Sequence, residues 1–174
     1  MVVTGRYSPL GVLEKKIVNS PAYIGAELYL RKKKNWKYSA DFLEHSLQDN
    51  PSDLYYGNKS ALAKKLKKSR KIRNKVKKFK KSNYLAKKYS ISFKHGDMFG
   101  AFHNVDLYID RFKKGKINCV LKDYYDFSYE KYNSFINIAN NYEWVCQAFK
   151  ISNGYHITVE MKFKDRKNKN KDLI

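Results

Sequence analysis

The hydrophobic pattern of this chain changes its period near Tyr89, and that change limits the folds that the chain can adopt. Over residues 61–88 apolar residues recur at helical spacing, whereas afterwards they alternate with polar residues as in half-buried strands. The segments 99–110 and 116–127 both alternate, and the short polar turn with Gly115 between them predicts a β-hairpin. We therefore expect an α+β fold, in which N-terminal helices, including a long basic amphipathic helix, precede a mainly antiparallel β-sheet.

Each predicted strand has one apolar face. A further short strand is expected at 89–95 and a last one at 154–163. In the first strand of the hairpin, the residues expected to face inward are His103, Val105, Leu107 and Ile109. In the last strand, the inward residues are Tyr155, Ile157, Val159, Met161 and Phe163, and the outward ones include His156 and Glu160.

Four regions follow from composition and pattern. They are a helical or irregular region at 1–58, the basic helix at 59–88, the β-rich domain at 89–164 and a polar tail at 165–174. The first region contains a short helix, for which Ser39 is the expected cap and Asn50-Pro51 the expected end. No run of about 18 apolar residues predicts a membrane span, and the N-terminus lacks the pattern of a secretory signal. Cys119 and Cys146 lie outside any CxxC or Cys/His cluster, so we expect buried free thiols.

The positive charge is concentrated in one segment. The chain has a formal net charge of +21, and the stretch between Asp53 and Asp97 has 16 of its 37 Lys and Arg residues and no acid. Within residues 61–88, an apolar stripe lies on a helix that Asp53 or Ser60 would cap, with a break expected near Ser82-Asn83. The stripe consists of Leu62, Leu66, Ile72, Val76 and Phe79.

Two interpretations of this helix remain open. Its lysines can form a solvated face that only keeps the protein soluble. Alternatively, because like charges repel, the face gains free energy by meeting a polyanion such as nucleic acid, an anionic membrane surface or an acidic partner. We favour an anionic target. The candidate anion-binding residues are Lys64, Lys67, Lys68, Arg70, Lys71, Arg73, Lys75 and Lys78.

A second candidate site lies in LKDYYDF, residues 121–127, at the end of the second hairpin strand. Strand alternation places Asp123 and Tyr125 on one side and Asp126 on the other. Such residues often simply end a strand. The alternative is a catalytic constellation, to which nearby strands would add acids and bases. Its further candidates are His103, His156 and Glu160.

The order of helix, strand, Gly-Asp turn, GAF segment, two strands and Asp-x-Tyr-Asp-Phe resembles the activity domain of colicin M and its relatives. The resemblance covers about half of the chain, roughly residues 60–135. The matching residues are Asp123, Tyr125, Asp126 and Phe127, with His95-Gly96-Asp97 and Gly100-Ala101-Phe102 upstream. Where the family has a His-Arg pair after this motif, the chain has Tyr132-Asn133, so His103 or His156 would have to replace that histidine in space.

The resemblance implies a bacteriocin-like toxin that hydrolyses a lipid-linked peptidoglycan precursor at a membrane. It implies Mg²⁺ held by Asp123 and Asp126, Tyr125 orienting a phosphate or the water, and an immunity protein as a partner. It also implies a secreted or delivered effector without a cleavable signal peptide. The rival hypothesis is a nucleic-acid-binding protein or nuclease toxin, cytoplasmic in that case, because the charge suits phosphates and tyrosines stack on unpaired bases.

Overall fold

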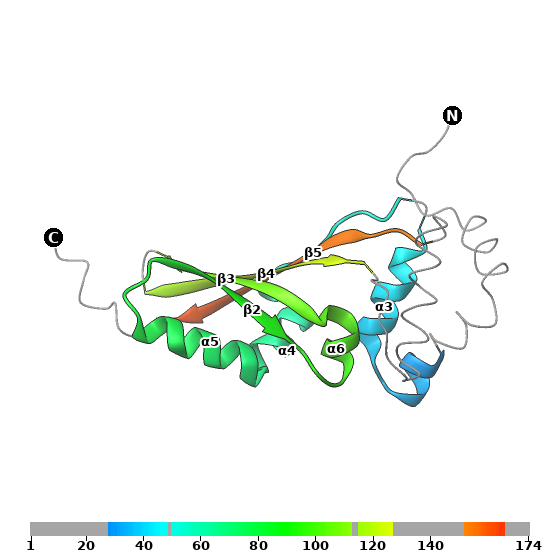
Figure 1. The fold of residues 1–174 in the computed structure, drawn as a ribbon, viewed down its shortest axis with the longest axis horizontal. Coiled ribbons are helices and arrows are strands. Elements are labelled where there is room, and N and C mark those ends of the chain that lie inside the picture. The colour runs from blue at the N-terminus through cyan, green and yellow to red at the C-terminus, as the bar shows by residue number, and fades with distance from the viewer. Residues whose placement is uncertain (1–27, 49, 113–114, 127–151, 166–174) are drawn as a thin grey trace. The chain divides into compact units, whose positions relative to one another are not determined.

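The computed structural model describes residues 28–48, 50–112, 115–126 and 152–165 (Figure 1). The expected α+β fold is confirmed. The helical elements are η1 (Tyr29–Lys33, a π-helix), α3 (Lys37–Ser46), α4 (Ala61–Lys68), α5 (Arg70–Lys81) and α6 (Asp97–Phe102). The strands are β1 (Leu54–Tyr56), β2 (Ala86–Ser92), β3 (Asn104–Phe112), β4 (Lys116–Tyr125) and β5 (Tyr155–Lys164).

The five strands form one sheet in the order β1-β5-β4-β3-β2. β3 pairs antiparallel with β2 and with β4, and the predicted hairpin closes with Phe112 opposite Lys116. β1 adds a parallel pairing to β5, with Leu54 opposite Ile157. The expectation of a mainly antiparallel sheet is therefore confirmed, with β1 as the parallel exception.

The chain forms two compact units, both discontinuous in sequence. The first unit comprises Met1–Asp53, Phe93–His103 and Tyr124–His156. The second unit comprises Leu54–Ser92, Asn104–Asp123 and Ile157–Ile174. Within the described residues, the second unit therefore contains α4, α5 and most of the sheet, whereas the first contains η1, α3 and α6.

In the second unit, α4 and α5 lie along one face of the sheet (Figure 1). The predicted apolar stripe of these helices is buried, and each of its five residues is at most 4% exposed. The strands contribute alternate residues to the same core, and the inward residues of β3 are confirmed from Val105 to Ile109. The inward face of β5 is also confirmed, although Phe163 is only half-buried.

The basic segment forms two helices rather than the long one that we predicted. Ser60 caps α4, accepting a hydrogen bond from the Ala63 N–H at 3.1 Å, and Ser69 between the helices has extended dihedrals. Leu66 and Ile72 are six residues apart, which in one continuous helix would put them about 120° apart around its axis. The break at Ser69 lets both side chains reach the core. The predicted break near Ser82 is confirmed as the end of α5, and residues 86–88 belong to β2.

The predicted strand at 99–110 is wrong in its first part, because residues 97–102 form α6. Ala101 and Phe102 are both buried, and two adjacent buried residues suit a helix better than an alternating strand. His103 follows α6 with φ 34°, a left-handed conformation, and is exposed. It therefore does not face inward with Val105, as we had predicted.

Ser39 is not the cap of α3, which begins at Lys37 with Trp36 at the capping position. It lies inside the helix and is buried. Cys119 is a buried free thiol, as expected. Cys146, the helical or irregular crossover predicted over 128–149 and residues 1–27 lie outside the described residues.

Candidate functional site

In the first unit, exposed polar side chains gather where β4 ends and β5 begins. The rings of Tyr124 and His156 lie 4.9 Å apart, and the Asp53 carboxylate accepts the His156 backbone N–H at 2.9 Å. Asp126 follows the end of β4 and is also exposed. We call Asp53, Tyr124, Asp126 and His156 the strand-end cluster. It provides two carboxylates, a phenol and an imidazole at the surface, which are groups suited to proton transfer.

Gly154 allows the close approach of Tyr124 to this cluster. A Cβ at position 154 would lie 2.4 Å from the Tyr124 hydroxyl oxygen, closer than van der Waals contact permits. A side chain at position 154 would push the Tyr124 ring away, and the contact between Tyr124 and His156 would be lost. The sequence pattern predicts Tyr125 rather than Tyr124 at the site. Strand alternation indicates the exposed residue correctly, because it places Tyr125 on the same buried face of β4 as Leu121 and Tyr124 on the other face.

Tyr125 is a core residue of the first unit. It is 6% exposed, and its ring lies 5.8 Å from Phe42 and 5.2 Å from Tyr155. The Tyr155 hydroxyl donates a hydrogen bond to the Phe42 carbonyl at 2.8 Å, which satisfies its buried polar end. The described contacts of Tyr125 are therefore those of an aromatic cluster, and its role in orienting a phosphate stays a prediction.

The other predicted catalytic residues are divided between the units. His103 belongs to the first unit, where its ring packs edge-on against Phe99 at 5.0 Å. Asp123 and Glu160 belong to the second unit. There the hydrogen bond to the Glu160 carboxylate raises the pKa of the Tyr55 hydroxyl.

The predicted magnesium ligands have opposite strand parity. Asp123 is half-buried and lies on the side of β4 that faces inward, whereas Asp126 is exposed just beyond the end of the strand. Residues three apart on an extended chain face opposite sides, so strand geometry does not pair these two carboxylates. Over the described ranges, no group of three or more His, Cys, Asp or Glu residues could hold a metal ion. Magnesium binding stays a prediction.

The upstream residues of the resemblance form a buried polar contact between α3 and α6 in the first unit. The Asp97 carboxylate accepts hydrogen bonds from the Ser39 N–H at 2.9 Å and the Ser39 hydroxyl at 3.1 Å. A Cβ at Gly100 would lie 2.6 Å from the Ser39 hydroxyl oxygen, so this close approach requires glycine. Gly96 has a φ of 73°, which also favours glycine. These residues therefore have a packing role in the described structure.

In the second unit, the outward side of α4 and α5 is a surface of Lys and Arg, which we call the basic face. Six of the eight predicted anion-binding residues are exposed on it, whereas Lys67 and Lys75 are half-buried. Lys67 donates a hydrogen bond to the Asn58 side-chain oxygen at 3.2 Å, and Lys75 lies 5.4 Å above the Tyr89 ring. The exposed members of the basic face are Lys64, Lys65, Lys68, Arg70, Lys71, Arg73, Lys77, Lys78 and Lys81.

The charge of the second unit is largely unbalanced. Its described residues contain 20 Lys and Arg but only 5 Asp and Glu. Three of those acids have partners away from the exposed side of the helices: Asp106 with Lys88 at 2.7 Å, Asp165 with Arg111, and Glu160 with Tyr55. Neither α4 nor α5 contains an acid. The basic face is therefore a concentrated positive surface supported by an apolar core.

Comparisons with protein-family models, curated proteins and solved structures found no match to this chain. Among the described residues, no helix has the length and apolar character needed to cross a membrane. In the described part of the chain, the strand-end cluster and the basic face combine exposed polar or charged side chains most densely.

Proposed function

We propose that this protein is a toxin-like effector that binds a polyanionic target through its basic face and hydrolyses a phosphate or pyrophosphate ester. The observation that carries the proposal is the absence of any acid from α4 and α5, whose apolar stripe is already buried. Because the apolar side of these helices is buried in the core, most of their Lys and Arg side chains lie on the exposed side. A face of this charge attracts polyanions such as nucleic acids and anionic membrane surfaces.

The magnitude of this attraction is appreciable. Each basic residue near an anionic membrane surface contributes about 1 kcal/mol, and contacts to nucleic-acid phosphates release counterions in proportion to their number. The exposed members of the basic face are numerous enough to give firm binding by either route. We therefore expect affinity to fall steeply as salt concentration rises.

The strand-end cluster supports the hydrolytic part of the proposal. In such a reaction, water attacks phosphorus, the bond from phosphorus to the leaving oxygen breaks, and that oxygen gains a proton. The candidate base and acid are the Asp126 carboxylate and the His156 imidazole, because both are exposed, His156 lies against Tyr124, and Asp126 follows the end of the same strand. His156 thus becomes the candidate to replace the histidine that the colicin M-like motif has and this chain lacks at Tyr132.

The binding proposal is tested by comparing two triple Lys→Glu variants, one in the second unit and one in the first. The triple variant Lys64→Glu, Lys68→Glu, Lys78→Glu should bind heparin and anionic vesicles at least ~10-fold more weakly and show a shallower salt dependence. Lys32→Glu, Lys34→Glu, Lys37→Glu is the matched control, since it changes net charge equally at exposed sites of the first unit. Equal losses in both triple variants would show that only net charge matters, and would contradict a specific face.

The hydrolytic proposal is tested by incubating the protein with purified RNA and with lipid-linked peptidoglycan precursor side by side. Asp126→Asn and His156→Gln should each abolish cleavage of the true substrate while leaving the melting temperature nearly unchanged, because both side chains are exposed. Asp110→Asn, at a half-buried acid of the second unit, is the control. Full activity in both strand-end variants would remove the cluster from the reaction.

A second candidate target is RNA or single-stranded DNA, favoured by Tyr108 on the sheet face opposite the helices. Tyr108 is 38% exposed, and the ammonium groups of Lys88 and Lys122 lie 5.6 and 5.7 Å from its ring centre. An exposed aromatic ring with flanking cations suits base stacking with phosphate contacts. Cleavage of RNA but not of the lipid precursor would establish this candidate over the first.

A further inference from the structure

Three large apolar side chains are exposed together at one end of β2 and β3 in the second unit. Tyr84 is 50% exposed, Leu85 79% and Phe112 64%. They are neighbours through the backbone, because the Arg111 N–H donates to the Leu85 carbonyl at 2.8 Å and Phe112 follows Arg111. We call these three residues the apolar tip. Single exposed apolar residues are common on protein surfaces, whereas three large ones on neighbouring backbone positions suggest an interaction site.

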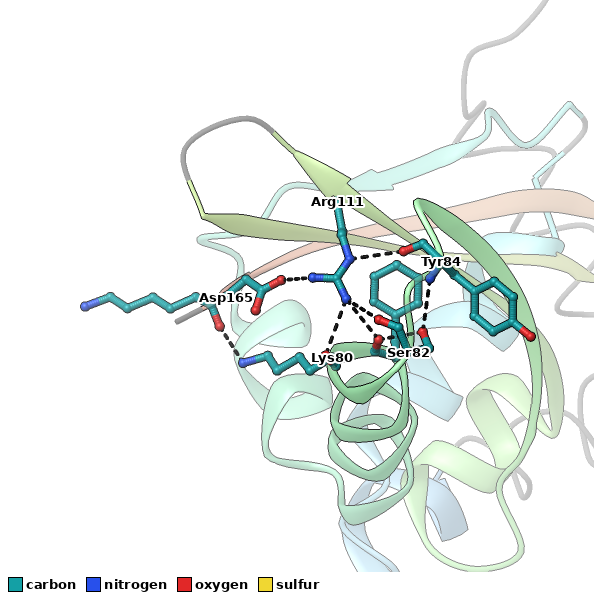
Figure 2. Close-up of polar contacts among 7 residues, drawn as sticks. Lys80, Ser82, Tyr84, Arg111 and Asp165 are labelled. Carbon is teal, nitrogen blue, oxygen red and sulfur yellow. Dashed lines mark hydrogen bonds and ion pairs between the residues drawn. The ribbon is translucent and has the colours of Figure 1, made fainter. Parts of the chain in front are cut away.

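Arg111 holds the chain between the end of α5 and Tyr84 in a defined position (Figure 2). Its guanidinium donates to the Tyr84 carbonyl at 3.0 Å, to the Ser82 carbonyl at 2.7 Å and to the carboxylate of Asp165. It also reaches carbonyls of the last turn of α5, those of Phe79 at 3.3 Å and Lys80 at 3.4 Å. A cation there stabilises the carbonyl end of the helix, where the Phe79 carbonyl also accepts the Ser82 N–H at 3.0 Å. The chain from α5 to β2 is thereby fixed, with the Tyr84 ring directed away from Arg111 (Figure 2).

The surroundings of the apolar tip are strongly basic. The last turn of α5 supplies Lys78, Lys80 and Lys81. Lys87 lies 4.0 Å above the Tyr84 ring, and Lys116 pairs with Phe112 across the hairpin. The nearest acids along these strands are Asp165, which is buried against Arg111, and Asp110, which is half-buried. Exposed apolar groups surrounded by cations are complementary to a surface with anionic headgroups over an apolar interior.

We infer that the apolar tip docks this protein on an anionic phospholipid bilayer. Tyr84, Leu85 and Phe112 enter the interfacial region while the basic face contacts headgroup phosphates. The inference rests on the proposed function, because the basic face supplies the long-range attraction. Leu85 favours lipid over nucleic acid, since an aliphatic side chain neither stacks on bases nor forms hydrogen bonds. The helices cannot take this part themselves, because their apolar stripe is buried in the core.

The test is co-sedimentation with phosphatidylcholine vesicles that contain or lack phosphatidylglycerol, alongside heparin affinity in solution. The variant Tyr84→Ser, Leu85→Ser, Phe112→Ser should bind anionic vesicles roughly 10-fold more weakly, equivalent to about 1.4 kcal/mol. Its heparin binding should be unchanged. Tyr55→Ser is the matched control, because Tyr55 is 62% exposed elsewhere in the second unit. The triple variant Lys64→Glu, Lys68→Glu, Lys78→Glu should lose both vesicle binding and heparin binding.

Two outcomes would overturn the inference while leaving the proposed function intact. One is a serine variant that binds anionic vesicles as tightly as the parent, and the other is a parent that binds heparin but no vesicles, as expected if the tip contacts a protein or nucleic acid. A parent that binds neither would instead refute the proposed polyanion binding. If the serine variant does not fold, Leu85→Trp keeps the test decisive. Its fluorescence should be quenched by brominated lipids far more than that of Tyr55→Trp, and equal quenching would contradict docking through the tip.

Discussion

The two units of this chain differ sharply in charge and in the contacts that hold them together. The described residues of the first unit contain 6 basic and 5 acidic side chains, against 20 and 5 in the second. The first unit combines an aromatic cluster around Phe42 with the buried polar contact between Ser39 and Asp97. The second has two helices with regular apolar stripes over a sheet of alternating residues.

The difference shows how one chain separates stability from charge. In the second unit the apolar core provides the stabilising free energy, so the surface can carry repelling charges. In the described residues of the first unit the basic and acidic side chains are nearly equal in number, and Arg31 contacts Asp41 at 2.6 Å and Glu44 at 2.8 Å. Where positive and negative side chains are nearly equal in number, the net electrostatic attraction for a polyanion is weak. We therefore expect the proposed polyanion binding in the second unit and the proposed chemistry in the first.

The largest expected effect tests whether the core of the second unit carries its stability. Leu107 is fully buried in β3, so Leu107→Asp should unfold the protein, with a loss above ~4 kcal/mol, because it buries an unpaired charge. Tyr108→Asp is the control one residue along, on the other face of the strand, and should cost less than about 1 kcal/mol. Circular dichroism during urea titration measures both. Normal folding of Leu107→Asp would mean that the two faces of β3 are assigned the wrong way round.

The next prediction makes one substitution in each unit. Arg111→Met should destabilise the protein by about 3 kcal/mol, because it leaves Asp165, only 2% exposed in its side chain, without its cation. Arg31→Met removes a similar pair from the first unit, but there Arg31 is 32% exposed, and about 0.5 kcal/mol is expected. Urea denaturation at neutral pH distinguishes the two. Similar losses would mean that the Arg111 network is no more than a surface ion pair, and the apolar tip would lose its proposed support.

Much of the fold was predictable because alternation and helical spacing report burial directly. The strands β3, β4 and β5 were predicted nearly in full, and so was the stripe of α4 and α5. Two features depend on contacts between distant residues and were missed. α6 is stabilised by the Ser39–Asp97 contact, whose partners are 58 residues apart. β1 has three residues and pairs with a strand about 100 residues later, so local pattern alone does not reveal it.

The candidate site was predictable only in part, for the same reason. LKDYYDF was identified from its composition, and His156 and Asp126 remain candidates there. Asp53 was considered only as a helix cap, although it accepts the N–H of His156, 103 residues later. Arg111 was one of many basic residues in the sequence. Its role became visible only when the end of α5, the start of β2 and the end of β5 came together around it (Figure 2).

The prediction with the smallest expected effect tests whether the core of the second unit is shielded from the basic surface of that unit. Burial and, to a smaller extent, Asp110 raise the pKa of the Cys119 thiol from 9.0 to about 12, although Lys80 and Lys67 act to lower it. Desolvation therefore outweighs the basic surface. The folded state holds this proton more tightly than the unfolded state. The stabilisation that the protonated thiol contributes to the free energy of unfolding is therefore complete below pH 9 and is lost as pH rises from about 9 to about 12. Between pH 7 and pH 10 the parent should lose about 1.4 kcal/mol more stability than Cys119→Ala, in which other groups titrate equally. Urea denaturation at both pH values measures this difference. Equal losses would show that water or the lysines reach the thiol, and that the apolar layer beneath the basic face is less complete than its burial indicates.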